Sequence, residues 1–312
     1  MLEAFVTYLR AERRYSELTV RNYRRDIEGF IAYIEMSGDD FHPGLVSADD
    51  IRGWIIWLSE KRKLSAASIN REISSVRSFF RWLRGTGVVE KDLFLKISTL
   101  KTPKRLPVWI PEKKMDAIAA GLLHRCDTGD LRERRDALIL LLFYSCGIRL
   151  AELINIDADD ISADFRSLKV HGKGDKERIV PLPEVTSGIL SRYVVEITAL
   201  DIWKFDRKPL FLTEKGKRIS RGGVYAVVRG ELEKMGVQGK RSPHVLRHTF
   251  ATHLLDSGAD MREIQELLGH ASLAATQVYT HNSIAALKKV YEGAHPRART
   301  EEDIIPEQGD HI

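Results

Sequence analysis

The sequence predicts a mainly α-helical protein with a small β-sheet, organised as two domains. Three observations lead to this prediction. Long segments repeat apolar residues at three- and four-residue spacing, one short segment has two β-rich arms around a glycine turn, and a proline-rich stretch divides the chain. The length of 312 residues is also about twice that of an ordinary domain, so each half can bury its own core.

Composition is that of an ordinary globular protein, with 43% hydrophobic and 30% charged residues. No stretch reaches the roughly 18 apolar residues of a membrane span, and the N-terminus lacks the apolar region of a signal peptide. We therefore expect a cytoplasmic protein without membrane insertion. Cys126 and Cys146 form no metal-ligand pattern, so we expect no metal, no disulfide and no cofactor.

The distribution of charge is more informative than the net charge of +5 and the pI of about 9.1, which suit a polyanionic partner without requiring one. Residues 1–110 hold 19 Lys and Arg against 14 Asp and Glu, and residues 111–312 hold 30 of each kind. The last twelve residues, EEDIIPEQGDHI, contain five acids and no Lys or Arg. Both halves are therefore basic, and the acidic end masks the charge of the second half.

The first hundred residues are predicted to form helices with basic outer faces. One helix has Thr19 as its N-cap and repeats apolar residues up to Ile34, and a later one repeats them from Ile69 to Leu83. Their outer faces mix arginine with serine and hold few acids, which suits phosphates, although such a face is also compatible with simple solvation. The arginines concerned are Arg21, Arg24, Arg25, Arg71, Arg77 and Arg81.

Residues 101–111, KTPKRLPVWIP, carry three prolines and three basic residues and show no helical or strand period. We interpret them as an extended linker between the two domains. Beyond the linker, the sequence predicts helices with a few strands. The individual predictions are a helix from Ala137 to Gly147, a short helix over 150–154, a hairpin within 167–183, a helix from Ser242 to Gly258 and a helix over 261–268.

Two basic residues of the second part lie at positions that a ligand could reach, one after a helix end and one at a hairpin tip. Arg149 follows the apolar helix, so its guanidinium either pairs with Glu152 one turn away or grips two phosphate oxygens at the floor of a cleft. Lys173 lies between two glycines at the hairpin tip, where it either only solubilises the turn or donates a proton from a mobile arm. Neither position alone decides between its two interpretations.

Two further motifs follow closer to the C-terminus. His244 and Arg247 lie three residues apart on one helix face, near an N-terminus that favours an anion, but one such spacing is expected by chance. His270 directly follows Gly269, and Tyr279 lies nine residues after His270. A tyrosine in such a place is ordinarily a packing residue with a solvated hydroxyl, so any function rests on the combination of these residues.

In this order, the residues resemble the tyrosine site-specific recombinases. The matching segments are SCGIRLAELINI, HGKGDKERIVPLP, SPHVLRHTFATHLLDSGADMREIQELLGHASLAATQVYTH and HPRA. The resemblance covers residues 1 to about 299, and within the family the chain looks most like the bacterial or archaeal Xer recombinases. It implies a helical, SAM-like core-binding domain over 1–100, the linker over 101–111, and an α+β catalytic domain over 112–299 that includes a C-terminal docking helix. Residues 300–312 are then an acidic tail, which we expect to be disordered.

The resemblance also implies a catalytic set and a chemistry that needs neither metal nor ATP. Tyr279 attacks a DNA phosphate and forms a 3′-phosphotyrosyl bond, which stores the energy for rejoining. Arg149 and Arg247 neutralise the transition state, and Lys173 protonates the leaving 5′ oxygen. The remaining roles are proton transfer for His244, a hydrogen bond to the phosphate for His270, and orientation of neighbouring groups for Glu152.

The partners implied are double-stranded DNA with a specific recombination site and a homo- or hetero-tetramer on two such sites. A paralogous recombinase and a septal DNA translocase are further candidates, and the six arginines listed above become candidates for DNA contact. We expect an enzyme that resolves chromosome or plasmid dimers. The alternatives are a mobile-element integrase or invertase, a type IB topoisomerase, and a non-catalytic DNA-binding regulator.

Overall fold

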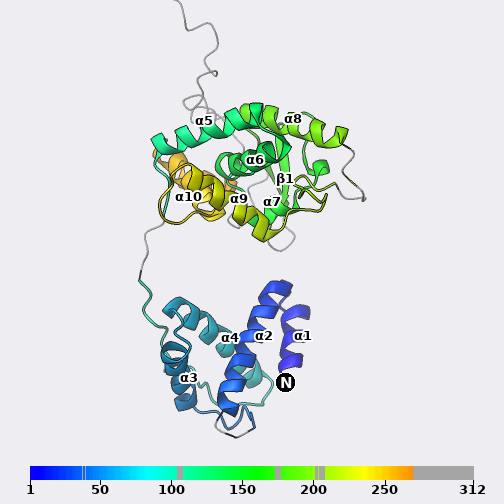
Figure 1. Cartoon of the computed structure of the whole chain (residues 1–312). Helices are drawn as coiled ribbons and strands as arrows, with labels where there is room; N and C mark the ends of the chain where they lie inside the picture. Colours follow the sequence, from blue (N-terminus) through cyan, green and yellow to red (C-terminus); the bar gives the residue numbers. More distant parts are fainter. Residues whose placement is uncertain are drawn as a thin grey trace, which may run out of the picture. The chain divides into compact units, whose positions relative to one another are not determined.

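The chain forms two compact units, Met1–Arg105 and Leu106–Ile312 (Figure 1). The computed structural model describes residues 1–36, 38, 40–103, 108–172, 177–200, 203 and 208–269. In these residues the fold is mainly α-helical with one small sheet, so the predicted fold class is confirmed. The predicted docking helix and acidic tail, together with most of the hairpin tip, lie outside the described residues.

The first unit buries the apolar faces of its helices in one core. These helices are α1 (Leu2–Ala11), α2 (Glu17–Glu35), α3 (Ala48–Glu60) and α4 (Ala66–Gly85). Aromatic side chains fill the centre, where the rings of Phe30 and Trp54 meet edge to face with centroids 5.0 Å apart. Edge-to-face contact suits aromatic quadrupoles, so it adds to the stability gained from burial.

The predicted N-cap of α2 is wrong by one turn. Ser16, and not Thr19, is the N-cap residue, and the Ser16 side chain accepts a hydrogen bond from the backbone N–H of Thr19 at 3.4 Å. Both residues are good capping types, so the sequence alone offers two starts. The earlier start adds a helical turn that carries Glu17, whose carboxylate pairs with Arg10 of α1.

The second unit is organised around one apolar helix, α6 (Leu131–Cys146), in which every residue from 137 to 146 is buried. A helix that is apolar all round must be covered on all sides. Figure 1 shows the neighbours that cover it. They are α5 (Glu112–Thr128), α8 (Glu184–Ala199), α9 (Arg221–Lys234) and α10 (Pro243–Asp256).

The start and the end of α6 have identifiable causes. The helix begins six residues before the predicted Ala137, because Asp130 and Glu133 form a reciprocal capping box ahead of a charged first turn. It ends where Gly147 adopts the left-handed conformation, with φ of 56°. This reversal starts the short helix α7 (Leu150–Asn155), with the short 3-10 helix η1 (Ala158–Asp160) after it.

The predicted hairpin is confirmed as an antiparallel pair, β1 (Ser167–His171) and β2 (Glu177–Pro181). The register pairs Leu168 with Val180, and both side chains are buried, while residues on the opposite face are more exposed. This alternation fixes the register because a one-residue slip would turn the apolar side chains to solvent. The buried faces of both strands therefore belong to the core of the second unit.

The described end of the predicted linker is attached to α10. The backbone N–H of Ile110 donates to the Thr249 hydroxyl at 3.0 Å, and its carbonyl lies 3.0 Å from Nε2 of the buried His253. The side chain of Ile110 is itself buried. Ile110 therefore belongs to the core of the second unit.

The last helix described is α11 (Met261–Leu267), which packs on α10. Within the described residues no helix is both long and apolar enough to cross a membrane. Both cysteines are buried, as predicted, and burial raises the pKa of each thiol to about 12.

Gly147→Ala should destabilise the second unit by about 2–4 kcal/mol, from left-handed strain together with overpacking. A Cβ at Gly147 would lie 2.5 Å from the ring of Phe250. Chemical denaturation measures the loss. The control is Gly188→Ala on α8, where an added Cβ meets nothing within 4 Å and helix propensity predicts a gain of about 0.5–1 kcal/mol. Equal effects of the two substitutions would contradict the proposed role of Gly147.

Candidate active site

Arg149 is held at the start of α7 by Glu152. The backbone N–H of Arg149 donates to Oε2 of Glu152 at 2.7 Å, and its Nη1 donates to Oε1 at 2.8 Å. Of the two interpretations of Arg149, the pairing with Glu152 is therefore present in the structure. The Glu152 side chain is only 1% exposed, so the carboxylate has left water and depends on its partners for its charge.

A second arginine, Arg178 on β2, grips the same carboxylate with both terminal nitrogens. Its Nη1 donates to Oε1 of Glu152 at 2.6 Å, and its Nη2 donates to Oε2 at 2.9 Å. This is the fork-to-fork geometry in which guanidinium and carboxylate bind most strongly. Sequence reasoning missed Arg178 because it resembles any polar residue of a strand, and its one signal is its place five residues after Lys173.

Arg247 on α10 completes the group from a third direction. Its Nη1 donates to the carbonyl of Gly147, and its Nη2 donates to the carbonyl of Leu268 at 2.7 Å. Nη2 of Arg149 reaches the carbonyl of the adjacent Gly269 at 3.0 Å. The structure thus brings Arg149 and Arg247 together at the two residues that precede His270.

The turn at Gly269 allows this close approach. Gly269 has a left-handed φ of 67°, and an added Cβ would lie 3.1 Å from Nη1 of Arg178 and 3.3 Å from Nη1 of Arg149. A larger residue would therefore be strained by its backbone and would press on both guanidinium groups.

The electrostatics of the group favour an added anion. Burial by itself raises the pKa of Glu152, but hydrogen bonds and charge from Arg178, and then from Arg149, outweigh burial and leave that pKa below its usual value. Burial and the nearby charge of Arg149 lower the pKa of Arg247 to about 10. At neutral pH three arginines therefore face a single carboxylate, and the excess positive charge can be relieved by a bound phosphate.

His244 lies one turn before Arg247 on α10. Although its side chain reaches solvent, desolvation by the surrounding atoms lowers the pKa of His244, and the charges of Lys240, Arg221 and Arg247 lower it further. His244 is therefore neutral at pH 7, the state in which an imidazole can accept a proton. The predicted residues Lys173, His270 and Tyr279 lie outside the described residues.

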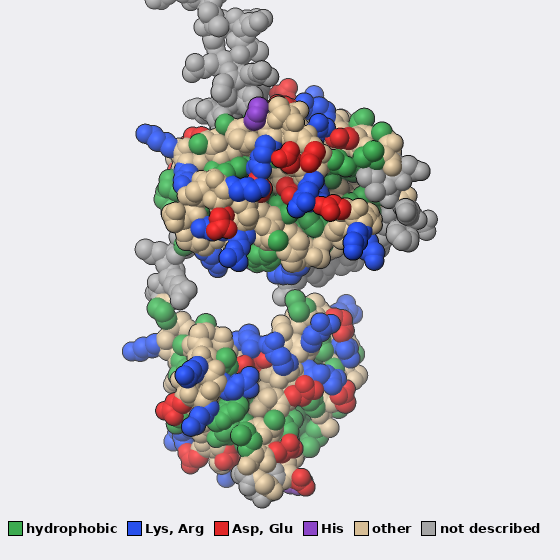
Figure 2. Space-filling model, viewed as in Figure 1, with side chains coloured by type: hydrophobic (Ala, Val, Ile, Leu, Met, Phe, Trp, Pro, Cys, Tyr) green, Lys and Arg blue, Asp and Glu red, His purple; other side chains and the backbone are tan. Residues whose placement is uncertain are grey.

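In the first unit, most of the predicted DNA-contact arginines also hold the fold together. Arg24 forms two hydrogen bonds with Glu3, at 2.5 and 2.6 Å. Arg25 and Arg71 both pair with Asp26, a buried carboxylate between α2 and α4. Figure 2 shows basic side chains interspersed with acidic ones on the visible face of this unit.

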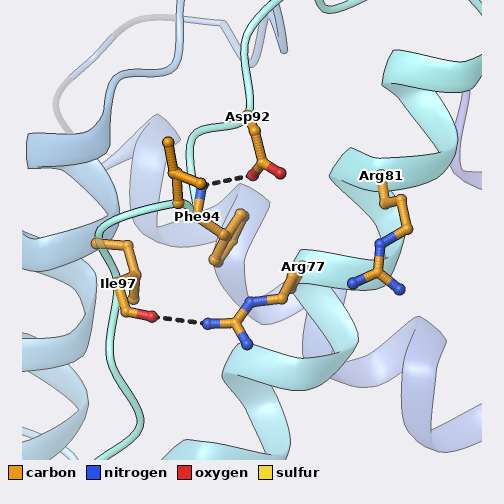
Figure 3. Close-up of a pocket in the computed structure, with 6 residues that line it drawn as sticks. Arg77, Arg81, Asp92, Phe94 and Ile97 are labelled. Atoms are coloured by element: carbon orange, nitrogen blue, oxygen red, sulfur yellow. Dashed lines mark hydrogen bonds between the residues drawn. The ribbon is translucent and has the colours of Figure 1, made fainter.

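Arg77 and Arg81 line a surface hollow next to the segment that follows α4 (Figure 3). Arg77 donates to the carbonyl of Ile97 at 2.8 Å and lies over the ring of Phe94, so it attaches that segment to α4. Within the described part of the chain, neither Arg81 nor Arg21 has a hydrogen bond or an ion pair. Their guanidinium groups are the ones most available for an outside partner.

Comparison with known proteins accounts for both units. The model of the phage integrase family matches residues 112–285, and the model of the phage integrase N-terminal SAM-like domain matches residues 2–87. The chain belongs to the phage integrase family. Tyrosine recombinase XerD of Listeria monocytogenes is 36% identical over 96% of this chain and 99% of the relative. Tyrosine recombinase XerC of Pelotomaculum thermopropionicum is 34% identical over 96% of this chain and 98% of that relative. The similar identities favour neither type over the other.

Solved structures agree on the fold. XerH site-specific recombinase, bound to palindromic difH substrate, matches 93% of this chain and 83% of its own, with a TM-score of 0.68 and 20% identity. The Tn1549 transposon integrase, in complex with transposon right end DNA, matches 94% and 98%, with a TM-score of 0.69 and 16% identity. The two units of this chain therefore have the same folds as the two corresponding parts of these solved structures.

Glu152→Gln should lower the free energy of unfolding by about 3 kcal/mol at pH 7.5, since it leaves two partly buried arginines without their counter-ion. Because folding lowers the pKa of Glu152, its contribution is full above about pH 4.5 and is lost as the pH falls through the lowered value. The difference between wild type and variant, measured by urea unfolding, should therefore shrink in acid.

The control is Glu214→Gln, which removes an exposed partner of Arg132 and should cost less than about 1 kcal/mol. If Glu152→Gln lowered the free energy of unfolding at pH 7.5 no more than this control does, the carboxylate would not be what holds Arg149 and Arg178 together.

Proposed function

We propose that this tyrosine recombinase cuts and rejoins duplex DNA at a specific site, with Tyr279 as its nucleophile. The observation that carries the proposal is the convergence of Arg149 and Arg247 at the carbonyls of Leu268 and Gly269. These carbonyls lie directly before His270 and ten to eleven residues before Tyr279. A pair of fixed cations at the entrance to this segment suits one phosphate positioned for attack by the tyrosine.

The proposed assignments give the following cleavage step. The Tyr279 hydroxyl oxygen attacks phosphorus, the bond between phosphorus and the 5′ oxygen breaks, and a 3′-phosphotyrosyl bond forms. Negative charge gathers on the non-bridging oxygens, where Arg149 and Arg247 stabilise it without having to reorganise. Neutral His244 assists removal of the tyrosyl proton, Lys173 donates a proton to the leaving 5′ oxygen, and His270 donates a hydrogen bond to the phosphate.

Rejoining is the reverse reaction with a different strand. A 5′ hydroxyl attacks the phosphotyrosine, the tyrosine leaves, and the number of phosphodiester bonds is unchanged. No ATP is needed because the covalent intermediate conserves the bond energy. The same six side chains therefore serve both directions.

We propose resolution of chromosome or plasmid dimers as the biological role, because relatives named XerD and XerC match nearly the whole chain at 36% and 34% identity. The role implies a cytoplasmic protein that acts as a tetramer on two DNA sites. A paralogous recombinase and a septal DNA translocase are proposed as further partners. Residues 1–100 form the core-binding domain and 112–299 the catalytic domain, with a docking helix near the end of that domain and an acidic tail at 300–312.

DNA contact by the first unit is proposed for the outer faces of α2 and α4. Arg21 and Arg81 are the least occupied of the six candidates within the described residues. Arg25 and Arg71 keep side chains that are 64% and 41% exposed while Asp26 holds them in place. Ion pairs of this kind restrict the rotamers of an arginine, so less entropy is lost when it binds a phosphate.

The test uses a duplex selected from a random-sequence library by repeated binding to the Tyr279→Phe protein. A nick near the centre of that duplex traps the covalent product, because the short strand end diffuses away. Wild type should form a DNA adduct that survives denaturing electrophoresis, and Tyr279→Phe should form none, since its ring lacks the attacking oxygen. Equal adduct formation by both proteins would exclude Tyr279 as the nucleophile, and absence of any wild-type adduct would contradict cleavage by this chain alone.

A further inference from the structure

We infer that Arg178 is a positioning residue of DNA cleavage, which neutralises Glu152 so that the charge of Arg149 stays available to the phosphate. The inference rests on the proposed function, because it assigns Arg178 a task in the same reaction. It concerns a residue that acts through Glu152 and not on the DNA.

The geometry separates the roles of the two arginines on Glu152. Arg178 commits both terminal nitrogens to the carboxylate, at 2.6 and 2.9 Å, and its side chain is 14% exposed. Arg149 commits one side-chain nitrogen, at 2.8 Å, and its side chain is 35% exposed. Arg178 is thus the fixed partner, and Arg149 keeps donors and surface for a ligand.

The contacts with Glu152 determine how much positive charge remains for a phosphate. Glu152 carries one negative charge, which the bidentate contact with Arg178 offsets, so the positive charges of Arg149 and Arg247 remain. Without Arg178, the buried carboxylate would have Arg149 as its nearest cation and would take up that charge. Only the charge of Arg247 would then be available to a phosphate, whereas the native site offers the charges of both Arg149 and Arg247.

A second contact links Arg178 to the segment that enters the nucleophile region. Its Nε donates to the carbonyl of Leu267 at 3.3 Å, and its Nη1 lies 3.1 Å from the position of a Cβ on Gly269. Arg178 therefore connects β2 to the turn at Gly269. Its removal would loosen that connection as well as change the charge.

The experiment measures the rate of adduct formation on the nicked duplex described above, with protein in excess so that binding is saturated. Arg178→Met should slow this rate by a factor on the order of 10–100, since a mispositioned catalytic group costs that much. Adding Glu152→Gln to Arg178→Met removes the uncompensated carboxylate. The double variant should therefore cleave faster than Arg178→Met, by about tenfold.

Two further variants separate charge from packing. Arg178→Lys keeps the charge without the fork, so its cleavage rate should be closer to that of wild type than the rate of Arg178→Met is. If the methionine variant does not fold, Arg178→Lys is compared with wild type alone, and a loss on the order of 10–100-fold would contradict the inference. The matched control is Arg125→Met, which removes one of the two basic partners, Arg125 and Lys234, that another buried carboxylate, Glu231, has among the described residues. It should lower stability but leave the cleavage rate of the folded protein unchanged.

The outcomes are distinct. Slow cleavage by Arg178→Met that the second substitution restores supports the inference. Cleavage by Arg178→Met at the wild-type rate overturns it, and so does a double variant no faster than Arg178→Met, because Arg178 would then act only through packing. A wild-type protein that forms no Tyr279-dependent adduct overturns the proposed function, and the inference falls with it.

Discussion

The arrangement of the site depends on one buried carboxylate. Glu152 is removed from water, and a charge in such a place is tolerated only with close, well-oriented partners. It obtains them from its own helix through Arg149 and from β2 through Arg178. Arg247 approaches from α10 and is held by backbone carbonyls on either side of the cluster. The carboxylate and these carbonyls together gather a surplus of positive charge in one place, which is the property that a phosphate-cleaving site needs.

The fold supplies this convergence through the packing of α6. Because α6 is apolar on all sides, other helices must enclose it, and α10 is among those that do. The left-handed Gly147 then turns the chain, and Arg149 begins α7, which packs against α9 and β1. The carbonyl of Gly147 accepts a hydrogen bond from Arg247, so the residue that ends the central helix also orients a site residue. Core packing and site geometry are therefore set by the same residues.

Local sequence patterns predicted most of the helices and the hairpin. They could not predict ion pairs between residues that are far apart in the sequence. Helical spacing identified the apolar helices, and the separation of three residues between Arg149 and Glu152 made their pairing one of two interpretations. Arg178 lies 26 residues from Glu152, and Arg71 lies 45 residues from Asp26, so no periodicity relates these partners. The start of α6 was missed for a similar reason, because its charged first turn has no apolar period and is specified by a capping box. The hairpin lysine, the second histidine and the tyrosine stay predictions from the sequence.

The most direct test of the central claim is a structure of the Tyr279→Phe protein on its selected duplex. The account predicts that the guanidinium groups of Arg149 and Arg247 both lie within about 3 Å of oxygens of one phosphate, at hydrogen-bond distance. It also predicts that Arg178 keeps both of its contacts with Glu152. A phosphate bound by Arg178, or Arg149 and Arg247 on different phosphates, would contradict the claim that one carboxylate takes one arginine and leaves two for the DNA.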